Sequence, residues 1–164
     1  MMRTVVTLVV ALVLLMLAGT AAMAANTDQQ TVTYEVQAIN EISVSGDPAA
    51  LIVSAATAGS QPDAATDATT TYSITTNQSN RKITGAINTA MPANTTLSIT
   101  LAAPTGGSSA GPVNLTALAA DLVTGISTLA ESAKQISYSF TALTTAGVIA
   151  SANKTVTLTV TAGS

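Results

Sequence analysis

The sequence predicts an all-β protein, an antiparallel, immunoglobulin-like β-sandwich of about seven or eight strands with one short helical turn. Three observations support this fold class. Apolar residues alternate with polar ones in segment after segment beyond residue 30. Turn-forming Gly, Pro, Asn and Asp recur between these segments. Many of the polar residues are Thr, whose branched side chain suits a half-exposed pleated surface.

The first 24 residues have the features of a secretory signal peptide. Arg3 precedes an apolar run over residues 5–18, which leads to the small-residue site Ala22-Met23-Ala24. We therefore expect export through the Sec pathway, cleavage after Ala24, and one β-sandwich domain over residues 25–164. The alternative is a retained membrane anchor, because residues 4–25 carry no charge and are long enough to span a bilayer.

The first predicted strand covers residues 31–45, which is long compared with the usual five or six residues. Its apolar side chains fall on one face, and Gly46-Asp47-Pro48 ends it. The apolar positions nearest the predicted processing site are Val32, Tyr34, Val36 and Ala38.

The next apolar run, residues 49–56, is nearly continuous and predicts a strand covered on both faces. A loop with Pro62 follows over residues 59–67. Residues 69–77 and 81–87 then alternate on either side of the turn sequence Asn77-Gln78-Ser79-Asn80, which predicts a hairpin.

Three later segments also alternate, over residues 95–102, 134–143 and 155–161, and a Gly- and Ser-rich loop covers residues 104–112. Alternation places a common set of side chains on the inner faces of the sheets. This predicted core consists of Tyr34, Val36, Leu51, Val53, Tyr72, Ile74, Leu97, Ile99, Ile136, Tyr138, Phe140, Val156, Leu158 and Val160.

Residues 113–133 combine two patterns. Val113 and Leu115 fit a strand over residues 113–117, whereas apolar residues further on recur at helical spacing. We expect a short strand followed by one or two helical turns over residues 119–123. A full helix reaching Ala133 is the alternative, although Gly125 and several Thr residues weaken it.

The composition excludes several kinds of chemistry. The chain has no Cys and no His, so it offers no Ser-His-Asp triad, no cysteine nucleophile and no thiolate or imidazole metal site. A net charge of −3 argues against a nucleic-acid partner, which requires a basic face. We expect neither enzymatic activity nor a cofactor.

Two binding functions have candidate residues. Asp47, Asp63 and Asp67 stand at turns or loops, where carboxylates could hold Ca²⁺, but their spacing fits turn formation better. Carbohydrate-binding modules stack sugars on exposed aromatic rings. All four aromatic residues here (Tyr34, Tyr72, Tyr138 and Phe140) are predicted to point inward, which leaves none for a sugar.

The last two strands, Ile136-Ser137-Tyr138-Ser139-Phe140 and residues 154–161, together with a long first strand after the signal peptide, resemble exported bacterial β-sandwich subunits of fimbrial or surface-fibre type. Many such subunits carry a disulfide and a C-terminal aromatic residue, and this chain has neither. The resemblance implies an N-terminal strand that completes the sheet of a neighbouring subunit.

The functional hypothesis is therefore an exported, non-catalytic structural or interaction protein of the cell surface. It would assemble with itself or with other surface proteins by donating residues 31–45, with Val32, Tyr34, Val36 and Ala38 as the contact row, and it would have no membrane contact after signal cleavage. The alternative is a monomeric exported module that binds a glycan or calcium.

Overall fold

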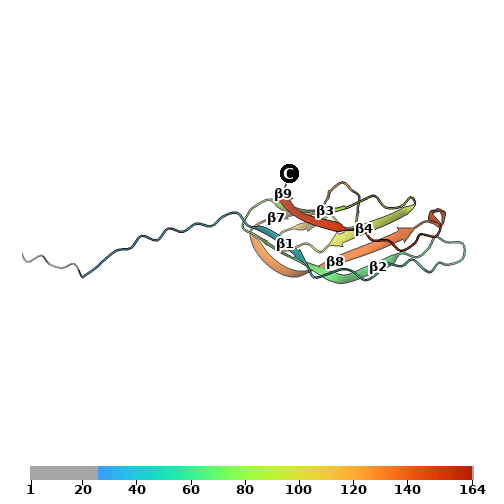
Figure 1. Cartoon of the computed structure of the whole chain (residues 1–164), viewed down its shortest axis with the longest axis horizontal. Helices are drawn as coiled ribbons and strands as arrows, with labels where there is room; N and C mark the ends of the chain where they lie inside the picture. The colour runs from blue at the N-terminus through green and yellow to red at the C-terminus, as the bar shows by residue number, and fades with distance from the viewer. Residues whose placement is uncertain (1–25, 164) are drawn as a thin grey trace, which may run out of the picture. The chain divides into compact units, whose positions relative to one another are not determined.

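Residues 36–163 contain two antiparallel β-sheets (Figure 1). The structure is a computed structural model that describes residues 26–163, so the predicted signal peptide lies outside the described residues. The prediction of an all-β, sandwich-like protein is confirmed. Across residues 26–163 no helix is long and apolar enough to cross a membrane.

The first sheet has the strand order β1-β2-β8-β4-β6, and the second has the order β5-β7-β3-β9. The strands of the first sheet are β1 (Asn40–Val44), β2 (Ala65–Thr76), β8 (Leu129–Ala142), β4 (Thr95–Leu101) and β6 (Val113–Asn114). Those of the second are β5 (Ser108–Ser109), β7 (Ala120–Ile126), β3 (Arg81–Ile87) and β9 (Val156–Ala162). A 3-10 turn, η1 (Thr144–Ala146), follows β8.

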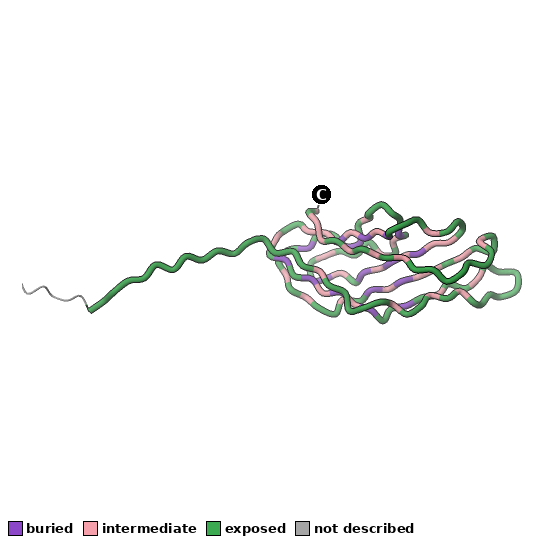
Figure 2. The backbone as a smooth tube through the Cα atoms, in the orientation of Figure 1, coloured by how far each residue is buried: buried purple, intermediate pink, exposed green. Residues whose placement is uncertain are grey.

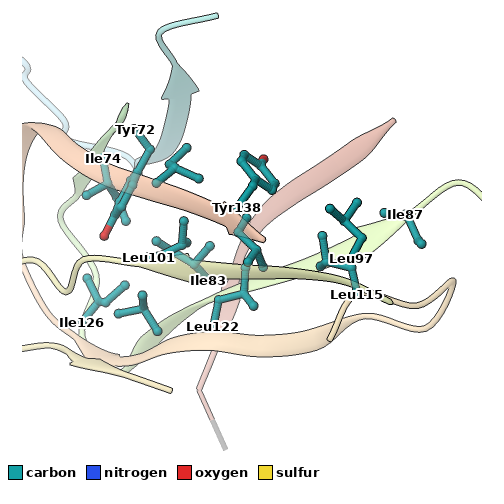
Figure 3. Packing of buried hydrophobic residues seen from close by; sticks show 13 residues of the cluster. Tyr72, Ile74, Ile83, Ile87, Leu97, Leu101, Leu115, Leu122, Ile126 and Tyr138 are labelled. Atoms are coloured by element: carbon teal, nitrogen blue, oxygen red, sulfur yellow. The ribbon is translucent and has the colours of Figure 1, made fainter. Parts of the chain in front are cut away.

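The core lies between the inner faces of the two sheets (Figures 2 and 3). Strands β3 and β4 show why the core lies there. Successive residues of a strand point to opposite faces of the sheet, and alternate residues of these two strands are buried. Six residues of the predicted core are confirmed as buried: Tyr72, Ile74, Leu97, Ile99, Ile136 and Tyr138. The buried core also includes Ile83, Ile87, Leu101, Leu115, Leu122, Val123 and Ile126.

The rest of the predicted core is less covered. Partly buried positions are Leu51, Val53, Phe140, Val156, Leu158 and Val160. For Tyr34 and Val36 the prediction is wrong, because their side chains are exposed. Their alternation fits a strand, but residues 31–39 form no strand and give these side chains no inner face.

The predicted strand over residues 31–45 is therefore confirmed only at its end, where β1 pairs with β2 from Asn40 opposite Thr76 to Val44 opposite Tyr72. The predicted strand over residues 49–56 is wrong. Only Ala56 makes an isolated bridge, to Pro62, and Ile52 is 70% exposed. Half of this run is Ala, which has little apolar area to bury and a low strand preference.

Residues 69–77 and 81–87 are confirmed as strands, but they do not form a hairpin. Strand β2 pairs with β1 and β8, whereas β3 pairs with β7 and β9. The turn between them carries the chain from one sheet to the other, with Asn80 at a φ of 50°. The buried rows of β2 and β3 lie in opposite sheets and share one core.

The helical turn predicted over residues 119–123 is wrong, and so is the alternative of a full helix to Ala133. This region forms β7 and the start of β8. The register of β7 against β3 shifts twice, so the neighbours Leu122 and Val123 are both buried, and Ile126 is the next buried residue. These irregularities disturb the period of two and leave a spacing that resembles that of a helix.

Candidate assembly surface

The segment before β1 combines a strand-like sequence with complete exposure. Residues 27–39 belong to no strand or helix, and every residue from 26 to 39 is exposed (Figure 2). The contact row proposed from the sequence lies here: Val32 is 71% exposed, Tyr34 is 90% exposed, Val36 is 79% exposed, and Ala38 is also exposed. Contiguous apolar side chains in water commonly mark an interaction surface.

Asn77 fixes the point where this segment joins the first sheet. Its side-chain amide donates to the carbonyl oxygen of Gln37 at 2.7 Å, and its Oδ1 accepts from the backbone N–H of Ile39 at 2.8 Å. The backbone N–H of Asn77 also donates to the carbonyl oxygen of Ile39 at 3.3 Å. These bonds hold residues 37–39 beside the β2–β3 turn and set the start of β1 at Asn40.

The two sheets end next to each other on one side of residues 36–163. Strand β1 is the last strand of the first sheet, β9 is the last strand of the second, and the two lie close together (Figure 1). Among the described residues each of them has a strand partner on one edge only: β2 for β1 and β3 for β9. We call this side, formed by Asn40–Val44 and Val156–Ala162, the β1–β9 seam.

The sequence of strand β9 has none of the features that usually protect an edge strand. Edge strands are commonly short, charged, bulged or interrupted by Pro. The edge strands β5 and β6 are two residues long, whereas β9 pairs with β3 over seven residues without a register shift. Its sequence, VTLTVTA, has no charge and no Pro. Its outer edge is therefore a long, regular row of backbone donors and acceptors.

The core is incompletely covered along the β1–β9 seam. Val156, Leu158 and Val160 of β9 stand opposite the buried residues Ile87, Gly85 and Ile83 of β3. The three β9 side chains are only partly buried, although they pack against the same core. Ile42 of β1 is likewise partly buried against it. These four side chains therefore lie at the margin of the core.

The ion pairs of the described residues lie away from the inner row of β9. Lys82 of β3 bonds Asp121 of β7 at 3.0 Å. Lys134 bonds Glu131 at 2.6 Å on β8, and the Thr105 N–H donates to the same carboxylate at 2.9 Å. Hydrogen bonds from Lys134 and Thr105 lower the pKa of Glu131 to about 2. Glu131 therefore ties the loop after β4 to β8.

The aspartates considered for calcium are not gathered into a site. Both carboxylate oxygens of the buried Asp67 accept from the Thr69 hydroxyl, and Oδ2 also accepts from the Thr69 backbone N–H. Within the described part of the chain no three carboxylates come together in a group that could hold a metal ion. The loop predicted over residues 59–67 is wrong at its end, because Asp67 lies inside β2, at a register shift against β8, and not in a loop.

The aromatic residues differ from one another in their surroundings. Tyr72 is buried, and its hydroxyl donates to the Ala102 carbonyl oxygen at 2.6 Å. Burial, reinforced by the negative charge of Glu131, raises the pKa of Tyr72 to about 12. Tyr138 is also buried and Phe140 is partly buried. The expectation that no aromatic ring is exposed is wrong for Tyr34.

The unpaired edge of β9 is the feature that sequence reasoning missed. Alternation identifies residues 155–161 as a strand but does not say whether that strand lies inside a sheet or at its edge. A sequence without charge or Pro, such as VTLTVTA, is typical of an internal strand, whereas β9 lies at the edge of its sheet. Comparison with known proteins finds no matching family model, no similar curated protein and no similar solved structure.

Proposed function

We propose that this chain is an exported, non-catalytic structural protein of the cell surface whose copies assemble by donating the exposed segment before β1. The observation that carries the proposal is the alternating row Val32, Tyr34 and Val36, which has the pattern of a strand but lies in no sheet. Each Val side chain that becomes fully buried stabilises a complex by about 1.5–3 kcal/mol. A sheet of another copy would provide that burial.

The donated segment is shorter than the sequence alone indicated. Residues 40–44 already pair with β2 as β1, and Asn77 holds residues 37–39. The donor is therefore residues 31–39, with Val32, Tyr34 and Val36 as its main contacts and Ala38 close to the point of attachment. Cleavage after Ala24 would leave only a few residues in front of this segment, which would give it a free end.

Other parts of the hypothesis belong to the same proposal. The signal peptide and Sec-dependent export, a location on the cell surface or outside it, and an immunoglobulin-like arrangement of the strands are supported by the sequence pattern. Other copies of the chain are the first partner, and other surface proteins are the second. The lack of His and Cys supports a role without catalysis.

A monomeric glycan-binding module is the second candidate, because the Tyr34 ring is 90% exposed and could stack on a sugar. The two functions make different demands on this side chain. Stacking requires an aromatic ring, whereas a donated strand requires only apolar bulk. Tyr34→Leu should therefore preserve assembly if the segment is donated, and should abolish glycan binding if Tyr34 is a sugar platform.

Sedimentation velocity of the exported chain tests the proposal. The intact mass should first show a chain that begins at Ala25. The unmodified chain should then form large species as its concentration rises. The double variant Tyr34→Ser/Val36→Ser should remain monomeric, because it removes the apolar row.

The matched control changes the other face of the same segment. Glu35→Ser/Gln37→Ser should assemble like the unmodified chain, and circular dichroism should show equal melting temperatures for the two double variants. A full-length chain that stays monomeric at high concentration would contradict the proposal. Equal assembly of the two double variants would contradict it as well.

A further inference from the structure

We infer that Asn114 is an acceptor for N-linked glycosylation and that the first sugar of the glycan, an N-acetylhexosamine, lies in a hollow beside it. This inference rests on the export included in the proposed function, but it is independent of the assembly. Asn114 begins the sequence Asn114-Leu115-Thr116, which has the Asn-x-Ser/Thr pattern of glycosylation acceptors in exported proteins.

Four asparagines of the sequence have this pattern, and their side chains differ in the structure. The other three are Asn77, Asn94 and Asn153. The Asn77 amide donates to the Gln37 carbonyl oxygen at 2.7 Å, and the Asn94 amide donates to the Thr145 carbonyl oxygen at 3.3 Å. A sugar on either nitrogen would crowd the carbonyl group that this nitrogen contacts. These two side chains are therefore poor acceptors in the folded chain.

The side chain of Asn114 is exposed and makes no hydrogen bond with another described residue. Asn114 lies on β6 at one edge of the first sheet, opposite Ser98 of β4. Asn153 is exposed as well, but it lies in residues 147–155, outside every strand and helix. Asn114 thus combines a free amide with a position held by strand pairing.

A hollow of about 250 Å³ borders Asn114. This volume is just below the roughly 300–1,000 Å³ typical of pockets for drug-sized ligands, so it suits one sugar unit. The lining includes two apolar residues and three that carry hydroxyl groups: Met91, Leu115, Thr95, Thr96 and Thr116. Because Asn114 itself is part of the lining, a sugar attached to its amide starts at the mouth of the hollow.

This mixed lining favours a neutral sugar with an acetamido group. The methyl group of an acetamido substituent buries apolar surface against Met91 and Leu115. Sugar hydroxyls need partners that both donate and accept, as Thr hydroxyls do. The Thr96 hydroxyl makes no hydrogen bond with another described residue, so it is free to serve as such a partner. None of the described residues that line the hollow is charged.

The modification is a glycosyl transfer from a lipid-linked oligosaccharide pyrophosphate, catalysed by an oligosaccharyltransferase of the export route. The side-chain nitrogen of Asn114 forms a bond to C1 of the first sugar. The bond from C1 to the pyrophosphate oxygen breaks, and the lipid pyrophosphate leaves with the electron pair. The amide nitrogen gives up one proton to a base of the transferase and keeps the other.

A glycan at Asn114 would also protect one edge of the first sheet. Among the described residues β6 has a strand partner on one side only, β4, and its two residues include no charge and no Pro. A bulky, hydrophilic chain on an edge strand hinders pairing with another strand. Strand β1 forms the opposite edge of the sheet, so the glycan lies away from the strand that follows the donated segment.

Peptide mass mapping of the exported chain, purified from its own cells, tests the acceptor. We expect a glycan on the peptide that contains Asn114 and none on the peptides that contain Asn77 or Asn94. Asn114→Gln and Thr116→Ala should each abolish this glycan, whereas the matched control Asn94→Gln should retain it. An exported chain with an unmodified Asn114, or with Asn77 modified as often as Asn114, would overturn the inference.

Thermal melting tests the position of the first sugar. The glycosylated chain should melt at a higher temperature than the chain after enzymatic removal of the glycan. Trimming the glycan to its first sugar should preserve the difference, because only that sugar lies in the hollow. Thr96→Ala should reduce the difference by removing a hydroxyl partner. A glycan that leaves the melting temperature unchanged would overturn the placement in the hollow.

Sedimentation velocity separates this inference from the proposed function. Asn114→Gln should assemble like the unmodified chain, because β6 and β1 lie at opposite edges of the sheet. A glycosylated chain that stays monomeric would overturn the proposed assembly and support the glycosylation site. A chain that keeps residues 1–24 and is not exported would overturn both.

Discussion

The contribution of a side chain to the stability of this protein depends on how completely the two sheets cover that side chain. Ile99 on β4 has no exposed surface, whereas Ile52 in the irregular segment before β2 is 70% exposed. Ile99→Ala should therefore lower the free energy of unfolding by about 2–5 kcal/mol. Ile52→Ala should change it by less than about 0.5 kcal/mol.

Urea denaturation of the two variants checks this prediction with the same substitution at both sites. Phe140→Ala provides an intermediate case, because Phe140 is only partly buried. Phe140→Ala should lower the free energy of unfolding by less than the loss of about 3–5 kcal/mol that is typical of a fully buried Phe. Similar losses for Ile99→Ala and Ile52→Ala would mean that the core is not where the structure places it.

The protonation state of Glu131 makes the stability of the folded protein depend on pH in the acidic range. Its folded-state pKa of about 2 lies below the ordinary value of 4.5, so its contribution is fully present above pH 4.5. That contribution should be lost as the pH falls from 4.5 through 2, because the protonated carboxyl no longer attracts Lys134. Glu131→Gln should melt at a lower temperature than the unmodified chain at pH 7, and the difference should shrink toward pH 2.

Lys134→Met provides an independent check on the same ion pair. It removes the cation but leaves the carboxylate, and its melting temperature should also approach that of the unmodified chain as the pH falls toward 2. A melting difference that is constant from pH 7 to pH 2 would show that the ion pair does not contribute.

At the scale of elements, β7 depends on one backbone conformation. Gly125 has a φ of 72°, a region in which side chains with a Cβ are strained. The space itself is open, because a Cβ there would meet nothing nearer than the Gly106 carbonyl oxygen at 3.7 Å. Gly125→Ala should therefore cost about 1–2 kcal/mol through the backbone alone.

Asn is the informative comparison at this position, because it adopts the left-handed region more readily than Ala. Gly125→Asn should lose less stability than Gly125→Ala, although its side chain is larger. Thermal melting compares the two variants directly. A greater loss for Asn would indicate that space, rather than backbone conformation, limits this position.

The sequence predicted elements well where alternation was strict and failed where it was not. The bounds of β3 and nearly those of β4 follow from alternation alone, because both strands bury one regular face. In β7 the register shifts bury two neighbours, and the period of two is lost. Residues 49–56 are apolar without being bulky, so hydrophobicity alone was misleading there.

At the scale of the whole molecule, alternation does not say which sheet a strand enters. The turn at Asn77-Gln78-Ser79-Asn80 has the residues of a hairpin, yet it connects the two sheets, because β2 and β3 both face one core. The unpaired edge of β9 is a property of the complete topology for the same reason. The donor row was predicted from the sequence, whereas its exposure and the β1–β9 seam required the structure.

The central claim is that residues 31–37 change from an unpaired segment to a strand when copies assemble. Amide hydrogen exchange of the full-length chain, measured at low and high concentration, tests it most directly. We predict rapid exchange of residues 31–37 in the dilute monomer and strong protection in the assembled protein, with no added protection at the internal strand β8. Protection of residues 31–37 in the dilute monomer, or rapid exchange in assembled material, would contradict the claim.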